Sequence, residues 1–406
     1  MDSSEKPLSF GIIGSVSPTT PLTHNPSYLL SLPEVQKLMI QSAQTPKAQA
    51  EIKSTLAESD ISLEDLLESG LLEQEGDVFK ISFILFLKED LVVIRDVCEE
   101  LASSLAKRYL AESSEFRNLL AQTSNPHHVL EEVAFILIGC FSLDWDGLQI
   151  TEELGYWLEP METELGDRYV AWAEERKPED ARKIYWGSHN DYYTDCVLTT
   201  FGDHGGLSRP GFPDLAWRMN NRIYQLDLAP EIEHNLVRSF SPFVSLFTEQ
   251  VGLIMLALAQ NNVQPQALAD EIGLDHEHLY ALLDLLDDLN YIQIAPTNIR
   301  PIIPVLLAKD AEIVEAILTR SGKILVDWLP THMDMLRERL AGITPLAYGL
   351  PFELIFSQIW HYLFGIANRQ LVKGGLFADP YHPDRRYPGF IPAVWHPTVL
   401  PEETTF

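Results

Sequence analysis

Helical and extended periodicities follow one another in a fixed order along the first third of the chain. After a leader over residues 1–25, which is rich in Ser, Thr and Pro and is expected to be irregular, helical spacing of apolar residues begins at Pro26. Further helices are predicted over Pro46–Ala57 and Leu63–Ser69. An extended segment entered at Leu71 and Leu72, a turn at Glu75–Asp77 and the β-branched and aromatic run Val78–Phe86 then predict a two-stranded hairpin. Three helices followed by such a hairpin are typical of a winged helix.

The same order of elements returns in the second half of the chain. Long helices are predicted from Lys88 and from near His128 in the first half. The second half predicts helices over Val244–Ala259 and Gln264–Ile272, a Leu-striped helix after Asp275, wing strands over Tyr291–Ile294 and Ile299–Leu306, and long helices from Ala308 and over Pro351–Leu371. When the halves are aligned, Asp90 falls on Asp310 and Glu131 on Glu353, so we expect an internal duplication.

The predicted fold is mainly α with small β wings. It comprises tandem winged-helix units over residues 26–142 and 230–375, and a small α+β insertion over 143–229. The insertion is rich in aromatic residues, and its short strands are expected to pack on the helical units. The tail over 376–406 is rich in Pro and aromatics, and we expect it to lie irregularly on the body of the protein.

One segment resembles known winged-helix proteins. The sequence QALADEIGLDHEHLYALLDLLDDLNYI, Gln266–Ile292, is similar to the winged helix-turn-helix of ArsR- and MarR-like regulators. It also resembles the dimerisation domain of small-molecule O-methyltransferases, but no Gly-rich cofactor-binding turn follows Ile292. The resemblance implies a fold, and it implies a function of DNA binding or dimerisation only as far as the residues at the surface permit.

The charge of the segment that would read DNA opposes groove binding. The predicted helix from Asp275 to Leu289 contains five acidic residues and no Lys or Arg. Its counterpart in the first unit carries Glu64, Asp65 and Glu68, also without a basic residue. Phosphate contacts supply most of the affinity for nucleic acid, so acidic faces repel it.

The overall charge of the chain also disfavours binding to nucleic acid. The 406-residue chain has 29 basic and 59 acidic side chains, a net charge of −30, which disfavours a broad phosphate-binding surface. Its three cysteines, Cys98, Cys140 and Cys196, form no CxxC pair and fit a reducing cytoplasm. No secretory signal is evident, and the apolar runs are too short to predict a membrane span, so we expect a cytoplasmic protein that does not bind membranes.

Two clusters contain metal-ligand chemistry. His189, Asp191, Asp203 and His204 lie on neighbouring predicted strands and could hold a divalent ion. The alternative, which we favour, is that they are turn residues, because their spacing is not that of a known metal motif. His276 and His278 are two apart on a predicted helix and therefore point in different directions, so a cap and a solvated face explain them.

The aromatic residues of the insertion are candidates for a ligand pocket. Such a pocket would be lined by Trp145, Trp157, Trp172, Trp186, Tyr192, Tyr193 and Trp217. The alternative, again favoured, is that these side chains form the core of the insertion. Arg385 and Arg386 form a small basic spot that could meet a carboxylate or phosphate, although surface ion pairs with nearby acids are the commoner arrangement.

These observations leave three functions open. The first is a non-enzymatic regulatory or adaptor protein whose winged-helix units bind a protein partner or a small ligand. The second is a ligand-responsive transcriptional regulator that binds DNA, which the charge opposes. The third is a metal-dependent enzyme using His and Asp of the insertion, although nucleophile elbows, P-loops and HExxH are absent. No catalytic residue and no cofactor is predicted, and the two halves are expected to pair as an intramolecular pseudo-dimer or, alternatively, in a homodimer.

Overall fold

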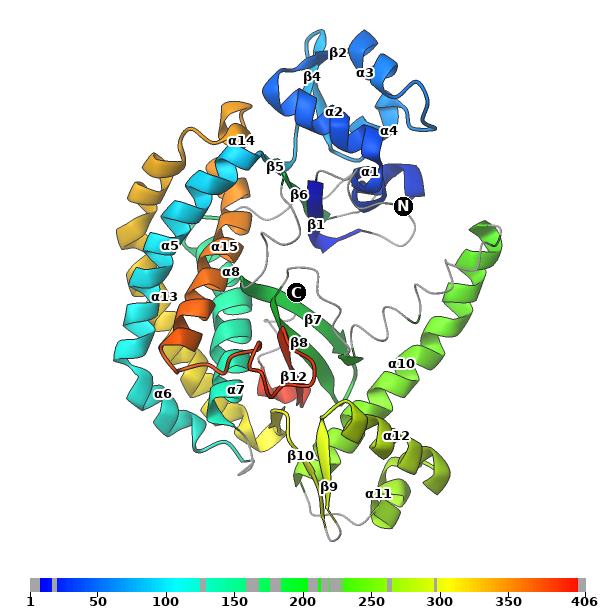
Figure 1. Ribbon diagram of the computed structural model, residues 1–406, viewed down its shortest axis with the longest axis vertical. Helices are drawn as coiled ribbons and strands as arrows, with labels where there is room; N and C mark the ends of the chain where they lie inside the picture. Colours follow the sequence, from blue (N-terminus) through cyan, green and yellow to red (C-terminus); the bar gives the residue numbers. More distant parts are fainter. Residues whose placement is uncertain are drawn as a thin grey trace.

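The computed structural model shows a mainly helical protein with several small sheets (Figure 1). It describes residues 8–16, 20–124, 129–157, 168–175, 184–203, 211–212, 219, 228, 230–260, 265–295 and 298–400. The expectation of a mainly α protein with a minor β component is confirmed. Two small helix-and-hairpin units lie at opposite ends of the view, and four long helices form a bundle beside them.

The first unit contains short helices and a three-stranded sheet. Its elements are α1 (Pro26–Ser31), α2 (Pro33–Gln44), β2 (Lys47–Ala48), α3 (Gln49–Thr55), α4 (Leu63–Glu68), β3 (Leu72–Glu75) and β4 (Val78–Ile81), with the short 3-10 helix η2 (Leu22–His24) before them. The strands are antiparallel in the order β2-β4-β3. The Ser62 hydroxyl accepts a hydrogen bond from Asp65 N–H and fixes the start of α4, and Gly70, with φ +67°, ends it.

The second unit repeats this order with a longer first helix. It contains α10 (Pro230–Gln260), α11 (Pro265–Ile272), α12 (His276–Asp288), β9 (Ile292–Ala295) and β10 (Asn298–Pro301). As expected, the Asp275 side chain caps α12 by accepting from His278 N–H. Asn290, with φ +61°, follows α12 at the place that Gly70 occupies after α4.

The two hairpins are paired in the same register. Leu72 pairs with Ile81 in the first unit, and Ile292 pairs with Pro301 in the second, so the residue numbers differ by 220 on both strands. The pairs Glu73 with Lys80 and Gln293 with Arg300 repeat at the same interval. A constant interval along both strands supports the internal duplication predicted from the sequence.

The bundle joins the two halves crosswise. Its helices are α5 (Lys88–Ala111), a continuous helix built of α7 (Leu130–Ala134), the π-helix η3 (Phe135–Asp146) and α8 (Gly147–Glu153), then α13 (Ala311–Leu340) and α15 (Phe352–Lys373). The short helices α6 (Ser113–Leu120) and α14 (Thr344–Ala347) occupy equivalent places between the long ones, and the 3-10 helix η6 (Ala308–Asp310) precedes α13. Helix α5 of the first half packs on α15 of the second, and α13 packs on η3.

Two aspartates form hydrogen bonds that link the two halves of the chain. Asp90 accepts a hydrogen bond from Leu87 N–H in its own half and from Thr344 N–H in the other half. Asp310 accepts a hydrogen bond from Leu307 N–H in its own half. It also accepts one from Ser124 N–H in the other half, at 2.7 Å. Both carboxylates are buried. Each half therefore supplies a buried acceptor to backbone N–H groups of the other.

The remaining strands form two mixed sheets. One has the order β1-β6-β5 and contains β1 (Leu8–Ser15), β6 (Arg168–Glu175) and β5 (Ile84–Phe86). The other has the order β11-β12-β8-β7 and contains β11 (Val305–Leu306), β12 (Phe390–Trp395), β8 (Val197–Asp203) and β7 (Tyr185–Tyr192), with the 3-10 helix η7 (Pro397–Val399) after β12. In both sheets the strand that follows a wing runs parallel to the strand that follows a long helix.

These sheets correct three expectations. The leader is not irregular throughout, because β1 pairs with β6 along its whole length. The tail is not irregular throughout either, because β12 is a central strand between β8 and β11. The strands predicted for the insertion exist, but they are divided between two sheets that also use strands from outside it. Pairing partners more than 150 residues apart in sequence leave no local signal.

Candidate functional site

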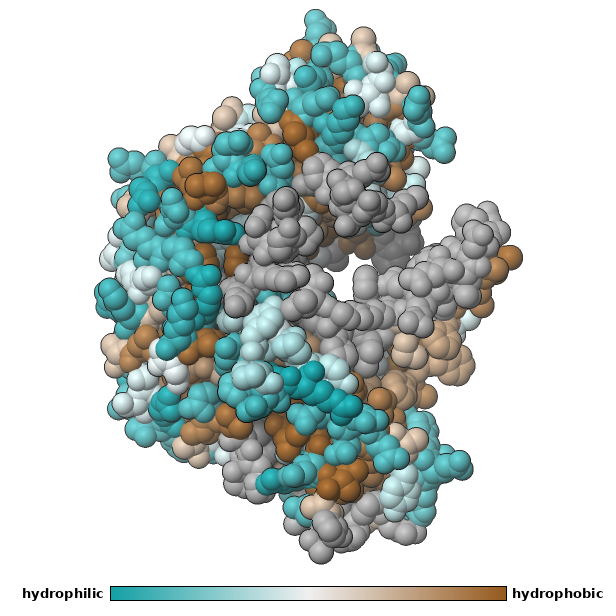
Figure 2. Space-filling model, viewed as in Figure 1, coloured by the Kyte–Doolittle hydropathy of each residue, from teal (hydrophilic) through white to brown (hydrophobic). Residues whose placement is uncertain are grey.

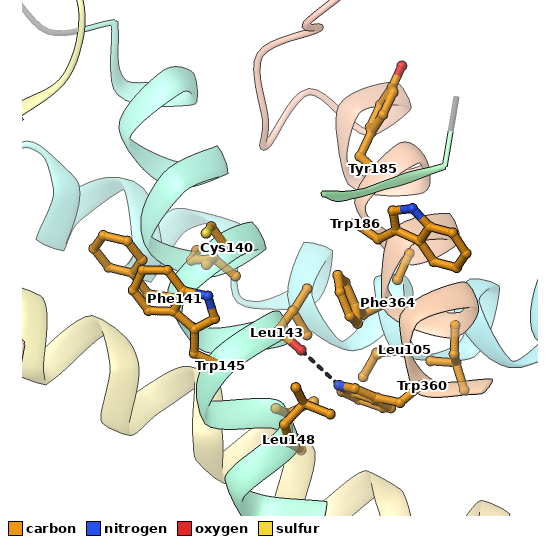
Figure 3. Packing of buried hydrophobic residues seen from close by; sticks show 14 of the residues in the cluster. Leu105, Cys140, Phe141, Leu143, Trp145, Leu148, Tyr185, Trp186, Trp360 and Phe364 are labelled. Atoms are coloured by element: carbon orange, nitrogen blue, oxygen red, sulfur yellow. Dashed lines mark hydrogen bonds between the residues drawn. The ribbon is translucent and has the colours of Figure 1, made fainter. Parts of the chain in front are cut away.

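Two backbone carbonyls of the π-helix η3 accept hydrogen bonds from side chains of α15. Trp360 Nε1 donates to the Leu143 carbonyl at 2.9 Å, as Figure 3 shows, and Asn368 Nδ2 donates to the Gly139 carbonyl at 3.3 Å. Both side chains are buried. The wider turn of a π-helix leaves backbone carbonyls available to such donors, and π segments often mark functional sites. The contact between η3 and α15 is therefore the first candidate site.

A buried carboxyl and an imidazole meet at this contact. Asp144, near the end of η3, accepts a hydrogen bond from Ser188 Oγ at 3.3 Å, and its Oδ1 lies 3.7 Å from His361 Nε2. His361 Nδ1 lies 2.7 Å from the Ser357 carbonyl, which can only accept, so the ring proton resides on Nδ1. The Nε2 lone pair of the neutral ring consequently faces Asp144.

Burial keeps both groups uncharged at neutral pH. Removal from water raises the pKa of Asp144 to about 8 and lowers the pKa of His361 to about 4. Burial also raises the pKa of Asp146, two residues further on, to about 7. The first two groups thus form a neutral acid beside a neutral base, and transfer of the proton from Asp144 to His361 is unfavourable because it would create two buried charges. The carboxyl lies between the hydroxyl and the ring, so Ser188 lacks the direct contact with His361 that a nucleophile needs.

Aromatic side chains enclose this pair. The Trp186 ring lies edge-on to His361 at 6.0 Å and to Tyr362 at 4.7 Å. Trp145 stacks on Phe141 at 4.7 Å within η3. Figure 3 shows Trp145 and Trp186 on opposite sides of the packed cluster. Contacts of this kind exclude water, which is the cause of the pKa shifts.

The predicted aromatic pocket is mostly core. Trp145, Trp157, Trp172 and Trp186 are buried in the main hydrophobic cluster, so these side chains pack against their neighbours. Tyr193 is partly buried against a second cluster, and Tyr192 is 46% exposed beside Trp395. Trp217 lies outside the described residues. The favoured alternative, that these aromatics build the core, is the one this packing supports.

The residues predicted to bind a metal are spread along one hairpin. His189 pairs with Thr200 and Asp191 with Leu198, whereas Asp203 pairs with Tyr185, four residues from His189 on β7. At about 3.3 Å per residue this places His189 and Asp203 roughly 13 Å apart. Asp203 instead accepts a hydrogen bond from the Tyr381 hydroxyl. His204 lies outside the described residues, and within those residues no group of three or more potential ligands occurs.

The other polar candidates make local contacts. His276 and His278 occupy the first turn of α12, where His278 N–H donates to the cap. Arg385 forms an ion pair with the partly buried carboxylate of Glu132, and burial raises the pKa of that carboxyl although the arginine opposes the shift. Arg386 lies 3.7 Å from Asp288. Its exposure leaves this second pair weak.

The second candidate site is a pair of acidic helix faces. On α12 the exposed residues are His276, Glu277, Tyr280, Ala281, Asp284, Asp287 and Asp288, of which four are acidic and none is Lys or Arg. On α4 and the hairpin after it, Glu64, Glu68, Glu73 and Glu75 are exposed. Figure 2 shows hydrophilic residues over much of the outer surface of the first unit. These are the surfaces on which the sequence predicts repulsion of DNA.

Sequence reasoning missed Asp144 and His361. A signal for the first existed, because Asp144 and Asp146 follow closely on the apolar run Val133–Phe141. A charged residue at the end of such a run is either a cap or a buried functional group. His361 could not be found in the same way, since it lies more than 200 residues away and meets Asp144 only through the crosswise bundle.

Comparisons with family models, with curated proteins and with solved structures found no match to this chain. By length and composition, two helices in the described part of the chain are able to cross a membrane, Leu130–Glu153 and Arg238–Gln260. The first is 83% buried inside the fold and the second 50%. Burial of the first is what the core helix of a bundle requires.

Proposed function

We propose that this chain is a non-enzymatic regulatory or adaptor protein of tandem winged-helix type, with its two units held as an intramolecular pseudo-dimer. The order helix, strand, helix, helix and hairpin in the first unit supports the winged-helix assignment, as does the sheet order β2-β4-β3. The shared register of the two hairpins supports the tandem arrangement. The acidic faces of α4 and α12 then bind a protein partner.

One observation carries this proposal: the exposed acidic side chains at equivalent places in both units. Helix α12 would enter the major groove of DNA in a DNA-reading winged helix. Its exposed Asp284 and Asp287 would face phosphates there, without a Lys or Arg on the helix to offset them. Carboxylates attract a protein surface that carries Lys and Arg, and complementary charge of this kind speeds association. A basic protein surface is therefore the partner chemistry that fits.

The first experiment separates this function from DNA binding. Fluorescence anisotropy of a labelled duplex is measured with the intact protein at about 50 mM and about 200 mM salt. We expect no complex at either concentration. A complex that forms at low salt and weakens steeply at the higher salt would overturn the proposal, because that slope reports phosphate contacts.

The second experiment tests the acidic face directly with matched variants. Asp284→Lys with Asp287→Lys reverses two charges on α12, and Glu312→Lys with Glu315→Lys reverses two exposed charges on α13 as a control of equal net charge. Bound proteins are compared by affinity capture and mass spectrometry. A partner of the acidic face is retained by the control and lost from the α12 variant. Identical binding to both variants would refute the assignment of this face.

A further inference from the structure

A small cavity lies where three distant segments of the chain meet. Its volume is about 60 Å³. The segments are the turn after α12, the end of the second wing and the chain around β12, with Glu132 of α7 at one side. Its apolar walls are formed by Leu289, Ile302, Ile303, Tyr387, Phe390 and Pro392. Apolar walls with a few polar groups are the usual composition of a small-molecule site.

The two arginines of this cavity differ in how firmly they are held. Arg385 donates to Glu132 and, at 3.0 Å, to the Asp379 carbonyl, so its guanidinium is occupied. Arg386 is 54% exposed and lies 3.7 Å from Asp288 Oδ1, which is beyond hydrogen-bond distance. The Asp288 side chain is itself 76% exposed. A long, solvated pair contributes little, so the Arg386 guanidinium can take another carboxylate at small cost.

The first half has a hydroxyl group at the equivalent place. Strand pairing makes Tyr169 on β6 the equivalent of Phe390 on β12. The Tyr169 hydroxyl donates to the Ser69 carbonyl, and Ser69 is the equivalent of Leu289. Tyr348 also reaches into this region, donating to the Phe83 carbonyl at 2.8 Å. In the second half Phe390 has no hydroxyl, and the cavity lies beside it.

We propose that this cavity binds a small monocarboxylate with an apolar body. The carboxylate would bind the Arg386 guanidinium in a charge-assisted pair, and the apolar part would contact Phe390, Ile302 and Ile303. A cavity of about 60 Å³ has room for roughly four to six non-hydrogen atoms. This is the size of a short-chain fatty acid. The cavity adjoins the acidic face of α12, because Asp288 of that face lies beside Arg386, but the proposal does not depend on the proposed protein partner.

The probe is butyrate, with butyramide as a neutral molecule of the same shape and inorganic phosphate as a second anion. Binding to the intact protein is measured by saturation-transfer NMR with titration. We expect butyrate to bind and butyramide to bind at least about tenfold more weakly, because it lacks the charge. Equal affinity for the two, no binding of butyrate, or tighter binding of phosphate would each overturn the proposal.

Three variants locate the site. Arg386→Gln removes the charge from an exposed position and should weaken butyrate binding about tenfold. Phe390→Tyr reproduces the residue of the first half, and its hydroxyl should occupy part of the cavity and weaken binding. Arg339→Gln is the control, because it removes another arginine from an exposed ion pair on α13. If the control weakens binding as much as Arg386→Gln does, the cavity is not the site.

Discussion

Replacing Asp144 by Asn isolates the energetic consequence of burying an ionisable group in the helical core. Asn is nearly the same size, and its carbonyl oxygen can accept the hydrogen bond from Ser188. Burial raises the pKa of Asp144 to about 8, whereas the pKa in the unfolded chain is near the ordinary aspartate value of 3.8. At neutral pH the unfolded chain has therefore released a proton that the folded protein still holds.

The magnitude follows from the difference between the two pKa values. As pH rises above 3.8, ionisation stabilises the unfolded chain by about 1.4 kcal/mol per pH unit until the folded carboxyl titrates near pH 8. At pH 7 the full cost to the wild type is about 4 kcal/mol. Relaxation and water penetration reduce such costs. We expect Asp144→Asn to raise the free energy of unfolding by about 2–4 kcal/mol at pH 7, and by less than about 1 kcal/mol near pH 4.

The assay is urea unfolding of both proteins near pH 4, 7 and 8.5, followed by tryptophan fluorescence. Asp284→Asn serves as the control, because Asp284 is exposed on α12 and its replacement should have almost no pH-dependent effect. A difference between Asp144→Asn and wild type that stays constant with pH would refute the reasoning. It would show that Asp144 has the same proton occupancy in the folded and unfolded states.

Three further predictions concern other buried or strained groups. Asp310→Ala should lower the free energy of unfolding by about 3 kcal/mol, since Leu307 and Ser124 lose a buried charged acceptor; urea unfolding with less than about 1 kcal/mol of loss would contradict this. Because burial lowers the pKa of His361 from 6.5 to about 4, its stabilising contribution is present above pH 6.5 and declines as pH falls toward 4. His361→Gln should reduce the dependence of the free energy of unfolding on pH between about 6.5 and 4. Equal slopes for the variant and the wild type in urea unfolding would contradict this prediction. Asn290→Gly should stabilise the protein by about 0.5 kcal/mol, because glycine adopts a positive φ without strain, and a lowered Tm would contradict this.

Local patterns in the sequence predicted much of the helical part of the fold. The hairpin after α4 and the cap at Asp275 follow from residues close together in the chain. The correspondence of Asp90 with Asp310 follows from aligning two local patterns that lie far apart in the sequence. Such features depend on turn chemistry and periodicity, which a single sequence records. Each of the two aligned aspartates accepts a hydrogen bond from its own half and another from the other half.

What the sequence could not predict depends on distant pairing. Strand β12 contains Pro392, which argues against a central strand, yet β12 lies between β8 and β11. Strand β1 is the partner of β6, about 160 residues further along the chain. The site at Asp144 and His361 needs the crosswise packing of η3 on α15 before its two residues meet. Local periodicity carries no information about which helix will become the neighbour.

The fusion of both halves into one chain allows them to diverge. In a homodimer, every substitution appears twice, so two symmetry-related sites are always either both open or both closed. Here Tyr169 occupies its place in one half while Phe390 leaves a cavity in the other. A single polypeptide can thus keep one copy of a site for structural support and adapt the other copy to a ligand, with one binding event per molecule and no cooperativity between identical sites.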